Sequence, residues 1–421
     1  MSDLSLFATL KNLKGNPRAA VLTEPLWGIP FNLYAPYASL YMLTLGVSDS
    51  QIGLITSIGL SFQIFFALIS GAVTDKFGRK LTTYLSDFLS WTIPTLILAF
   101  SQNFTYFLVA AIINSTWRIS ANSWLCILVE DAQKEDLVNI WALIYVSGLL
   151  AAFFSPFAGL LVNQFSLVPT MRGLYLFACV MMTAKFIVMN YYATETQQGK
   201  IRMEETRHQS LLSLMAGYGD VFKELLRSPA TLYMLGIMVA MSAANTISGT
   251  FWGILVTQKL HIPAEHIAIY PFARSAMLLL LYFFVIPRLS RQHFRRPMLT
   301  GLICYISGLL LLIAMPDKNY LLLLIATLLE ACGAAFVNPF MDAMVATAVN
   351  PAERARIMAI LYVVVIVFTT PFGWIGGRLS ELNRSLPFVL NLGMFAVAAV
   401  MVWGAAAVSK RAAAAAVEAA E

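Results

Sequence analysis

Long apolar segments recur along this chain of 421 residues, and they constrain its fold more than any other feature. Each is about 20 residues or longer, enough to cross a hydrocarbon core of about 30 Å as an α-helix. The residues are 59% hydrophobic and only 12% charged, whereas soluble domains are about 25% charged. The sequence therefore predicts an all-α integral membrane protein.

The apolar segments predict twelve transmembrane helices. Their ranges are 20–45, 51–74, 81–101, 104–130, 137–162, 172–193, 229–258, 266–287, 298–315, 319–349, 357–378 and 386–408. The polar stretch 194–228 divides them six and six, and its charged run TETQQGKIRMEETRHQ is typical of a solvated linker. We expect an N-terminal six-helix bundle over 1–193, a cytoplasmic linker with a surface helix near its end over 194–228, and a C-terminal six-helix bundle over 229–421.

Lys and Arg indicate the orientation in the membrane. If successive loops alternate sides, twenty of these residues fall on the side of both termini and five on the other. Because Lys and Arg concentrate in cytoplasmic loops, both termini are predicted to be cytoplasmic. The net charge of +6 is then explained without a nucleic-acid partner. The compact loops favour a bacterial inner (plasma) membrane.

The sequence shows no pattern typical of a catalytic or metal centre. The four cysteines lie in apolar segments without CxxC spacing, and the four histidines lie in loops or at segment ends. No P-loop or nucleophile elbow is present. We expect no metal, no cofactor and no enzymatic activity, and the lack of a nucleotide domain excludes an ATP-driven pump.

The loop GAVTDKFGRK, residues 71–80, concentrates charge between the second and third predicted helices. Its glycines allow close helix approach and a tight turn, and its arginine can form a bidentate pair with a carboxylate. The pattern G-x-x-x-D-[RK]-x-G-[RK]-[RK] resembles the signature of the major facilitator superfamily. The matching residues are Gly71, Asp75, Gly78, Arg79 and Lys80.

This resemblance covers nearly the whole chain and implies two pseudo-symmetric six-helix bundles. Two matches at one offset of 215 residues, including SPFAGLL at 155–161 with TPFGWIGG at 370–377, also indicate a duplicated unit. In the superfamily the loop acts as a latch between the second and eleventh helices, a role that the resemblance implies for Asp75 and Arg79. The alternative is that the loop's cations only fix the topology.

The fifth predicted helix carries part of a second pattern. Proton-coupled drug exporters of the superfamily have G-P-x-x-G-G there, and this chain has Pro156 and Gly159, with Leu160 in place of the last glycine. The residues therefore either mark an exporter or only bend and pack a helix.

Charged residues inside the apolar segments are the main candidate site residues, because a charge at bilayer depth costs about 2.5–3.5 kcal/mol on insertion scales. Helices three and six are peripheral in the superfamily, so Asp87 and Lys185 are expected to be structural. The charged residues at bilayer depth are Glu24, Asp87, Arg118, Lys185, Arg274, Glu330 and Asp342.

Two polar stripes lie on the fourth and tenth predicted helices. Arg118 and Glu330 differ in depth by roughly 5 Å, so we expect them to meet across the centre. The resemblance implies coupling or substrate binding for Arg118, while Glu330 or Asp342 would gain and lose a proton. Permanent salt bridges are the alternative. The stripes consist of Asn114, Arg118, Asn122, Glu330, Asn338 and Asp342.

Aromatic and polar residues on the first and seventh predicted helices are expected to line the central cavity with Glu24 and Arg274. A cavity of this kind suits an amphipathic organic molecule, although aromatic residues also serve as packing and interface anchors. The residues are Tyr34, Tyr37, Asn245 and Trp252.

Together these features predict a secondary active transporter of a small organic solute that works by alternating access. Proton-coupled efflux by antiport is favoured over proton- or sodium-coupled uptake by symport. A non-transporting ligand-binding receptor is the alternative of another class, and the intact loop signature argues against it because a static binder needs no latch. The expected partners are a small-molecule substrate, H+ and the lipid bilayer, with the protein acting as a monomer. The charge of the substrate stays open, because the pairing of the buried charges is unknown.

Overall fold

The structure, a computed structural model, describes residues 10–133, 136–214, 229–288, 294–348 and 354–418. Every regular element in these ranges is a helix, which confirms the predicted all-α class. The chain forms two compact units. Unit 1 comprises Met1–Ser48, Ile58–Ala216 and Pro263–Phe272, and unit 2 comprises Asp49–Ser57, Gly217–Ile262 and Ala273–Glu421.

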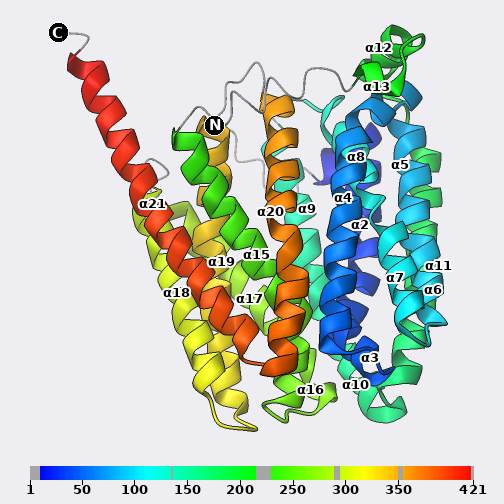
Figure 1. The fold of residues 1–421 in the computed structure, drawn as a ribbon. Coiled ribbons are helices and arrows are strands. Elements are labelled where there is room, and N and C mark those ends of the chain that lie inside the picture. Colours follow the sequence, from blue (N-terminus) through cyan, green and yellow to red (C-terminus); the bar gives the residue numbers. More distant parts are fainter. Residues whose placement is uncertain (1–9, 134–135, 215–228, 289–293, 349–353, 419–421) are drawn as a thin grey trace. The chain divides into compact units, whose positions relative to one another are not determined.

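Unit 1 holds the helices of the first half of the chain and one short later segment (Figure 1). Helix α4 contributes its first residues to unit 2, and α17 begins in unit 1 and continues in unit 2. The helices are α2 (Gly15–Tyr34), η1 (Ala35–Tyr37), α3 (Ala38–Thr44), α4 (Asp49–Phe77), α5 (Arg79–Asp87), η2 (Phe88–Thr92), α6 (Ile93–Ala99), α7 (Phe104–Asn114), α8 (Trp117–Val129), α9 (Leu137–Ala151), η3 (Ala152–Phe154), α10 (Ser155–Phe165), α11 (Leu167–Tyr192), α12 (Gln197–Thr206), α13 (Leu211–Leu214), α16 (Ala264–Ile267) and α17 (Ile269–Phe284).

Unit 2 is built mainly from long helices of the second half. Helix α18 packs against α19, and α15 packs against α20 and α21. The helices are α15 (Pro229–Gln258), η4 (Ile286–Arg288), α18 (Arg295–Ala314), α19 (Tyr320–Ala348), α20 (Arg354–Leu382) and α21 (Leu386–Glu418).

Nine helical segments in the described ranges are long and apolar enough to cross a membrane. They coincide with nine of the twelve predicted segments. The other three predicted segments, 20–45, 81–101 and 104–130, are each divided into shorter helices, whereas 137–162, although divided into α9, η3 and α10, still forms one continuous apolar span. The structure therefore confirms a multi-pass helical membrane protein, but it confirms nine of the twelve segments as single spans.

Local chemistry explains the three divisions. In the first, Pro36 lies in the 3-10 turn η1, where its fixed φ suits the start of a turn. In the second, five residues form the π-helix η2. In the third, the Ser115 hydroxyl donates to the Ala111 carbonyl at 2.8 Å and Thr116 donates to the Ile113 carbonyl at 2.7 Å. Such side-chain bonds compete with the helical ladder.

A hydrophobic cluster fixes the helices of unit 1 that carry the candidate site. Ala20 and Val21 of α2 pack with Ile127 and Leu128 of α8 and with Met189 of α11. In lipid these side chains stabilise the unit through van der Waals packing between the helices, because the surrounding lipid tails are as apolar as they are. The cluster therefore sets the spacing of α2, α8 and α11 around the site.

In unit 2 the first residues of α4 pack closely against α20. A Cβ atom built on Gly53 would overlap the carbonyl oxygen of Gly373 and lie 2.9 Å from Cα of Gly377. Ser380 donates to the Asp49 carboxylate at 2.6 Å nearby. Glycines at this crossing let the two backbones approach each other.

The predicted linker contains two helices in its described part. Helices α12 and α13 fall within 194–228, and unit 1 extends to Ala216. The predicted surface helix, near 221–227, lies outside the described residues. The division of the chain at this linker remains a prediction.

Candidate transport site

Unit 1 contains a cavity of about 220 Å³, called here the wide cavity. Five elements contribute to its wall: α2, α5, η2, α8 and α11. The wall combines two carboxylates, one ammonium group and four indole rings. The lining residues are Glu24, Trp27, Asp87, Trp91, Trp117, Ser120, Ala121, Trp124, Lys185 and Phe186.

The charges of the wide cavity form one cluster. Lys185 Nζ lies 2.8 Å from Glu24 Oε2, and both side chains are almost fully buried. Asp87 is 8% exposed and interacts electrostatically with both. The Lys185 ammonium also lies 5.7 Å from the ring of Trp27 and 5.9 Å from that of Trp124. These distances are typical of cation–π contacts.

Aromatic side chains extend from the wide cavity along α2. Trp27 stacks on Phe31 at 4.7 Å and meets Trp91 edge-on at 5.0 Å. Phe31 contacts Tyr34, which packs against Tyr175 of α11 at 4.8 Å. Such offset and edge-on pairs are the favoured aromatic geometries. The aromatic residues therefore hold α2 against η2 and α11.

The π-helix η2 sets the positions of Asp87 and Trp91. Asp87 directly precedes η2 and Trp91 lies within it. The side chain of Asn114 donates to the Ser90 carbonyl at 2.7 Å and satisfies a backbone group of the widened turn. Single π-helical turns are frequent at functional sites. The predicted site residue Asn114 thus supports the cavity wall from α7.

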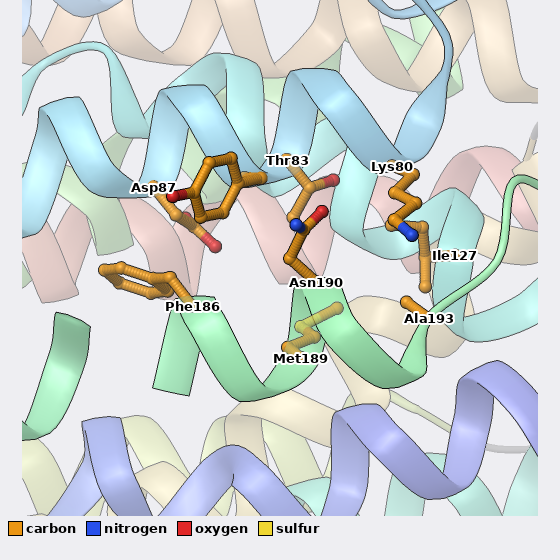
Figure 2. A pocket seen from close by; sticks show the side chains of 9 residues that line it. Lys80, Thr83, Asp87, Ile127, Phe186, Met189, Asn190 and Ala193 are labelled. Atoms are coloured by element: carbon orange, nitrogen blue, oxygen red, sulfur yellow. The ribbon is translucent and has the colours of Figure 1, made fainter. Parts of the chain in front are cut away.

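A second, narrow cavity of about 10 Å³ runs between α5 and α11. Figure 2 shows the side chains that line it, with Asp87 near one end and Lys80 near the other. Thr83 and Asn190 lie between them. Asp87 and Phe186 belong to both cavities.

The polar stripe of the fourth predicted helix forms three separate contacts. Arg118 Nε donates to Gln63 Oε1 of α4 at 2.9 Å, and its guanidinium lies 4.1 Å from the ring of Trp117. Asn122 donates to the Thr74 hydroxyl at 3.4 Å. Gln63 and Thr74 both belong to α4, so the polar stripe lies at the contact between α4 and α8. The predicted meeting of Arg118 with Glu330 joins residues of different units and remains a prediction.

The candidate residues of unit 2 are less closely assembled in its described part. Glu330 of α19 interacts electrostatically with Arg274 of α17, whose side chain is exposed. Asn338 and Trp252 are half-buried and Asn245 is exposed. The side chain of Asp342 lies outside the described residues. Sequence reasoning missed Asn391, which donates to Ser248 of α15 at 2.9 Å.

The charged loop, residues 71–80, forms an ion-pair network. Arg79 is 4% exposed. It lies 3.1 Å from the Glu130 carboxylate and 3.1 Å from Asp75. Asp75 also binds Arg202 of α12 at 2.9 Å and raises the pKa of that guanidinium by a hydrogen bond. The predicted latch with the eleventh helix remains a prediction. The partners seen in the described part of unit 1 are Glu130 and Arg202.

The start of α5 depends on a residue far away in the sequence. Gly78 has a φ of 83°, a conformation that favours glycine. The Glu195 carboxylate accepts hydrogen bonds from the backbone N–H groups of Arg79 and Lys80, both at 3.0 Å. A carboxylate at a helix N-terminus accepts hydrogen bonds from the free N–H groups and interacts favourably with the positive end of the helix dipole. Glu130, Glu195 and Arg202 were missed from the sequence, although each stands at or beyond the end of an apolar segment.

Replacing Arg202 with Ala is expected to loosen α12, which lies beyond the ends of α4 and α5 (Figure 1). A half-exposed ion pair is worth about 0.2–1 kcal/mol, so cleavage after Glu204 by a glutamyl endopeptidase should become up to about fivefold faster. Lys200→Ala, an exposed change on the same helix, should leave the rate unchanged. Equal rates for the two variants would show that the Asp75–Arg202 pair does not hold the helix.

The fifth-helix residues have a packing role in the structure. Pro156 lies in the first turn of α10 after the 3-10 turn η3. A Cβ atom on Gly159 would overlap the Glu265 carbonyl oxygen of α16. Tyr34 and Tyr37 are likewise buried in the packing of unit 1 and do not line the wide cavity. The exporter interpretation of Pro156 and Gly159 remains a prediction.

The structure places Asp87 and Lys185 in the wall of the wide cavity, beside Glu24. Their expected structural role remains a prediction. A helix that is peripheral in the whole protein can still line a cavity inside one unit. Its position therefore does not decide whether its side chains line a cavity. The available signal was the presence of tryptophans near these charges, at Trp27 and Trp91.

The fold and the site define a class: a multi-pass helical membrane protein with a charged, aromatic cavity among its helices. The family model of the Major Facilitator Superfamily matches residues 27–295 and again residues 237–421. The chain belongs to this superfamily of membrane transporters. The predicted membership of this superfamily is thereby confirmed, as is the prediction of a transporter rather than an enzyme.

Two curated relatives share the name Multidrug resistance protein MdtG. The protein of Serratia proteamaculans (strain 568) is 30% identical over 191 residues, 43% of this chain and 45% of that protein. The protein of Rahnella sp. (strain Y9602) is 29% identical over 187 residues, 42% of this chain and 44% of that protein. The match thus spans less than half the length of these relatives.

Solved structures of transporters share the fold. The nucleoside transporter NupG superposes with a TM-score of 0.70 at 16% identity, covering 94% of this chain and 99% of that chain. A POT family transporter in complex with 5-aminolevulinic acid gives 0.70 at 12% identity, covering 94% and 96%. The human organic anion transporter MFSD10 (TETRAN) gives 0.64 at 15% identity, covering 92% and 98%.

Proposed function

We propose that the protein exports small organic molecules and that protons moving in the opposite direction drive the export. The observation that carries this proposal is the wide cavity, where aromatic walls meet a buried cluster of two acids and one base. Indole rings supply apolar and cation–π contacts for an amphipathic molecule. Carboxylates beside them can exchange a proton when such a molecule enters.

The relatives named Multidrug resistance protein MdtG support the direction of transport. Within the proposal, the charged loop acts as the conformational latch, and Arg118 and Glu330 take part in coupling. The two six-helix bundles, joined by the 194–228 linker, would alternate access to the substrate. Both termini would lie in the cytoplasm of a bacterial cell, and the transporter would act as a monomer.

Proton release from acid-loaded inside-out vesicles tests the proposal. The protein is reconstituted and challenged separately with lipophilic cations, neutral drugs and organic anions. Release by one class is expected, with loss of release in Glu330→Gln. A fall of about tenfold or more is expected in Arg118→Ala, because a hydrogen bond to a charged group is worth about 1.5–3 kcal/mol.

The matched control is Glu381→Gln in the same unit. Glu381 forms an exposed pair with Arg378 at 3.2 Å, so its replacement should leave release unchanged. If folded wild-type protein releases no protons with any class, export of these compounds is excluded and uptake becomes the better proposal.

A further inference from the structure

Asp87 stands at the boundary of two cavities in unit 1. It lines the wide cavity with Glu24 and Lys185, and it lines the narrow cavity that reaches Lys80. The residue is the last of α5, and the π-helix η2 begins directly after it. Its carboxylate can therefore meet a substrate on one side and water on the other.

The charges of Glu24, Asp87 and Lys185 indicate that this cluster can bind one proton. Lys185 neutralises one carboxylate, and its partner at 2.8 Å is Glu24. With Asp87 also ionised, the three groups carry one excess negative charge. A net charge at bilayer depth is costly. One proton on Asp87 makes the cluster neutral.

The hydroxyl of Ser120 can serve both states of Asp87. In the structure it donates to the Trp117 carbonyl at 3.0 Å, and it interacts electrostatically with Asp87. A hydroxyl has one proton to donate and can also accept. As oriented toward Trp117, it can accept the proton of the neutral acid, and after rotating toward Asp87 it can donate to the ionised carboxylate. Neither state of Asp87 is left without a partner.

The narrow cavity supplies a path to Asp87. Its volume of about 10 Å³ is close to the space that one water molecule needs. Figure 2 places the polar groups of Thr83 and Asn190 between Asp87 and Lys80. Lys80 lies in the first turn of α5 and is the last residue of the charged loop. A water molecule held there can pass a proton between Asp87 and that end of unit 1.

We propose that Asp87 is a proton-binding site of this protein and that the narrow cavity between α5 and α11 is its exchange path. The O–H bond of Asp87 forms with a proton delivered by water and breaks when water removes it. The groups facing Asp87 are Lys80 and Tyr84 of its own helix, Glu24 of α2, Ser120 of α8 and Lys185 of α11. The coupling of this proton to export rests on the proposed function.

Infrared difference spectra of the purified full chain, recorded during a pH titration without substrate, test the site. Wild type should show the carbonyl-stretch band of a protonated carboxylic acid that Asp87→Asn lacks. Asp87→Glu should shift this band, which keeps the test valid if the Asn variant does not fold. A spectrum of folded Asp87→Asn identical to wild type, or an unshifted band in Asp87→Glu, would overturn the site.

The exchange path is tested by the rate at which the protonated-carboxyl band of Asp87 changes after a pH jump. Asn190→Leu should slow the change at least tenfold by filling the narrow cavity. The matched change Asn163→Leu, on the exposed side of α10, should not. Equal rates in the two variants would overturn the path. A titrating Asp87 together with no substrate-driven proton release would retain the proton site and reject the exporter.

Discussion

Replacing Lys185 with Met is expected to lower the free energy of unfolding by about 3–5 kcal/mol and to abolish substrate-driven proton release. The change leaves the Glu24 carboxylate buried without its cation, which lies 2.8 Å away in wild type. It also removes the cation that interacts electrostatically with Asp87. Denaturant unfolding in detergent, combined with the vesicle assay, measures both effects.

A double-mutant cycle separates the loss of the Glu24–Lys185 ion pair from other destabilising effects of the substitution. Glu24→Gln combined with Lys185→Met should recover most of the lost stability, because no unpaired charge remains in the pair. Proton release should stay absent. The control Arg378→Met breaks an exposed pair and should cost no more than about 1 kcal/mol. If Lys185→Met is no more costly than this control, the pair does not have the buried character that the site requires.

Gly53→Ala is expected to destabilise the protein by about 1–3 kcal/mol, the cost typical of overpacking a well-packed contact. The new Cβ atom would overlap the Gly373 carbonyl oxygen and lie 2.9 Å from Cα of Gly377. Both neighbours are backbone atoms, so no side chain can rotate away. The start of α4 must therefore move relative to α20. The same unfolding measurement detects the change.

Gly249→Ala is the matched control for this prediction. A Cβ atom at Gly249 of α15 meets no atom within 4 Å. Since alanine favours a helix interior over glycine by roughly 0.5–1 kcal/mol, this variant should be slightly more stable than wild type. The two identical substitutions thus have opposite expected signs. Stabilisation by Gly53→Ala would contradict the close α4–α20 contact.

Much of the fold could be predicted because hydropathy is a property of consecutive residues. A helix in lipid satisfies its own backbone hydrogen bonds, so a long apolar run suffices to specify a span. The division of 81–101 was less accessible. Its π-helix is supported by Asn114, which donates to the Ser90 carbonyl from a different helix. Such a contact depends on packing and leaves no periodicity in the local sequence.

The sequence identified several residues of the candidate site, but it did not predict which residues contact each other. Charges such as Glu24 and Arg118 stand out because their neighbours are apolar. Their partners do not stand out in the same way. Gln63, which accepts from Arg118 at 2.9 Å, is neutral. Arg202, which binds Asp75 at 2.9 Å, belongs to a polar linker whose composition indicates only solvent exposure.

By itself the sequence determined the membrane class, nine of the twelve spans and the superfamily, because these depend on local composition and on one short loop signature. Only the tertiary structure decided which charges share a cavity. Glu24, Asp87 and Lys185 lie far apart in the chain and on different helices, and they meet because α2, α5 and α11 surround one space. Their proximity depends on helix packing. Hydropathy predicts which residues are buried, but it does not predict which residues they contact.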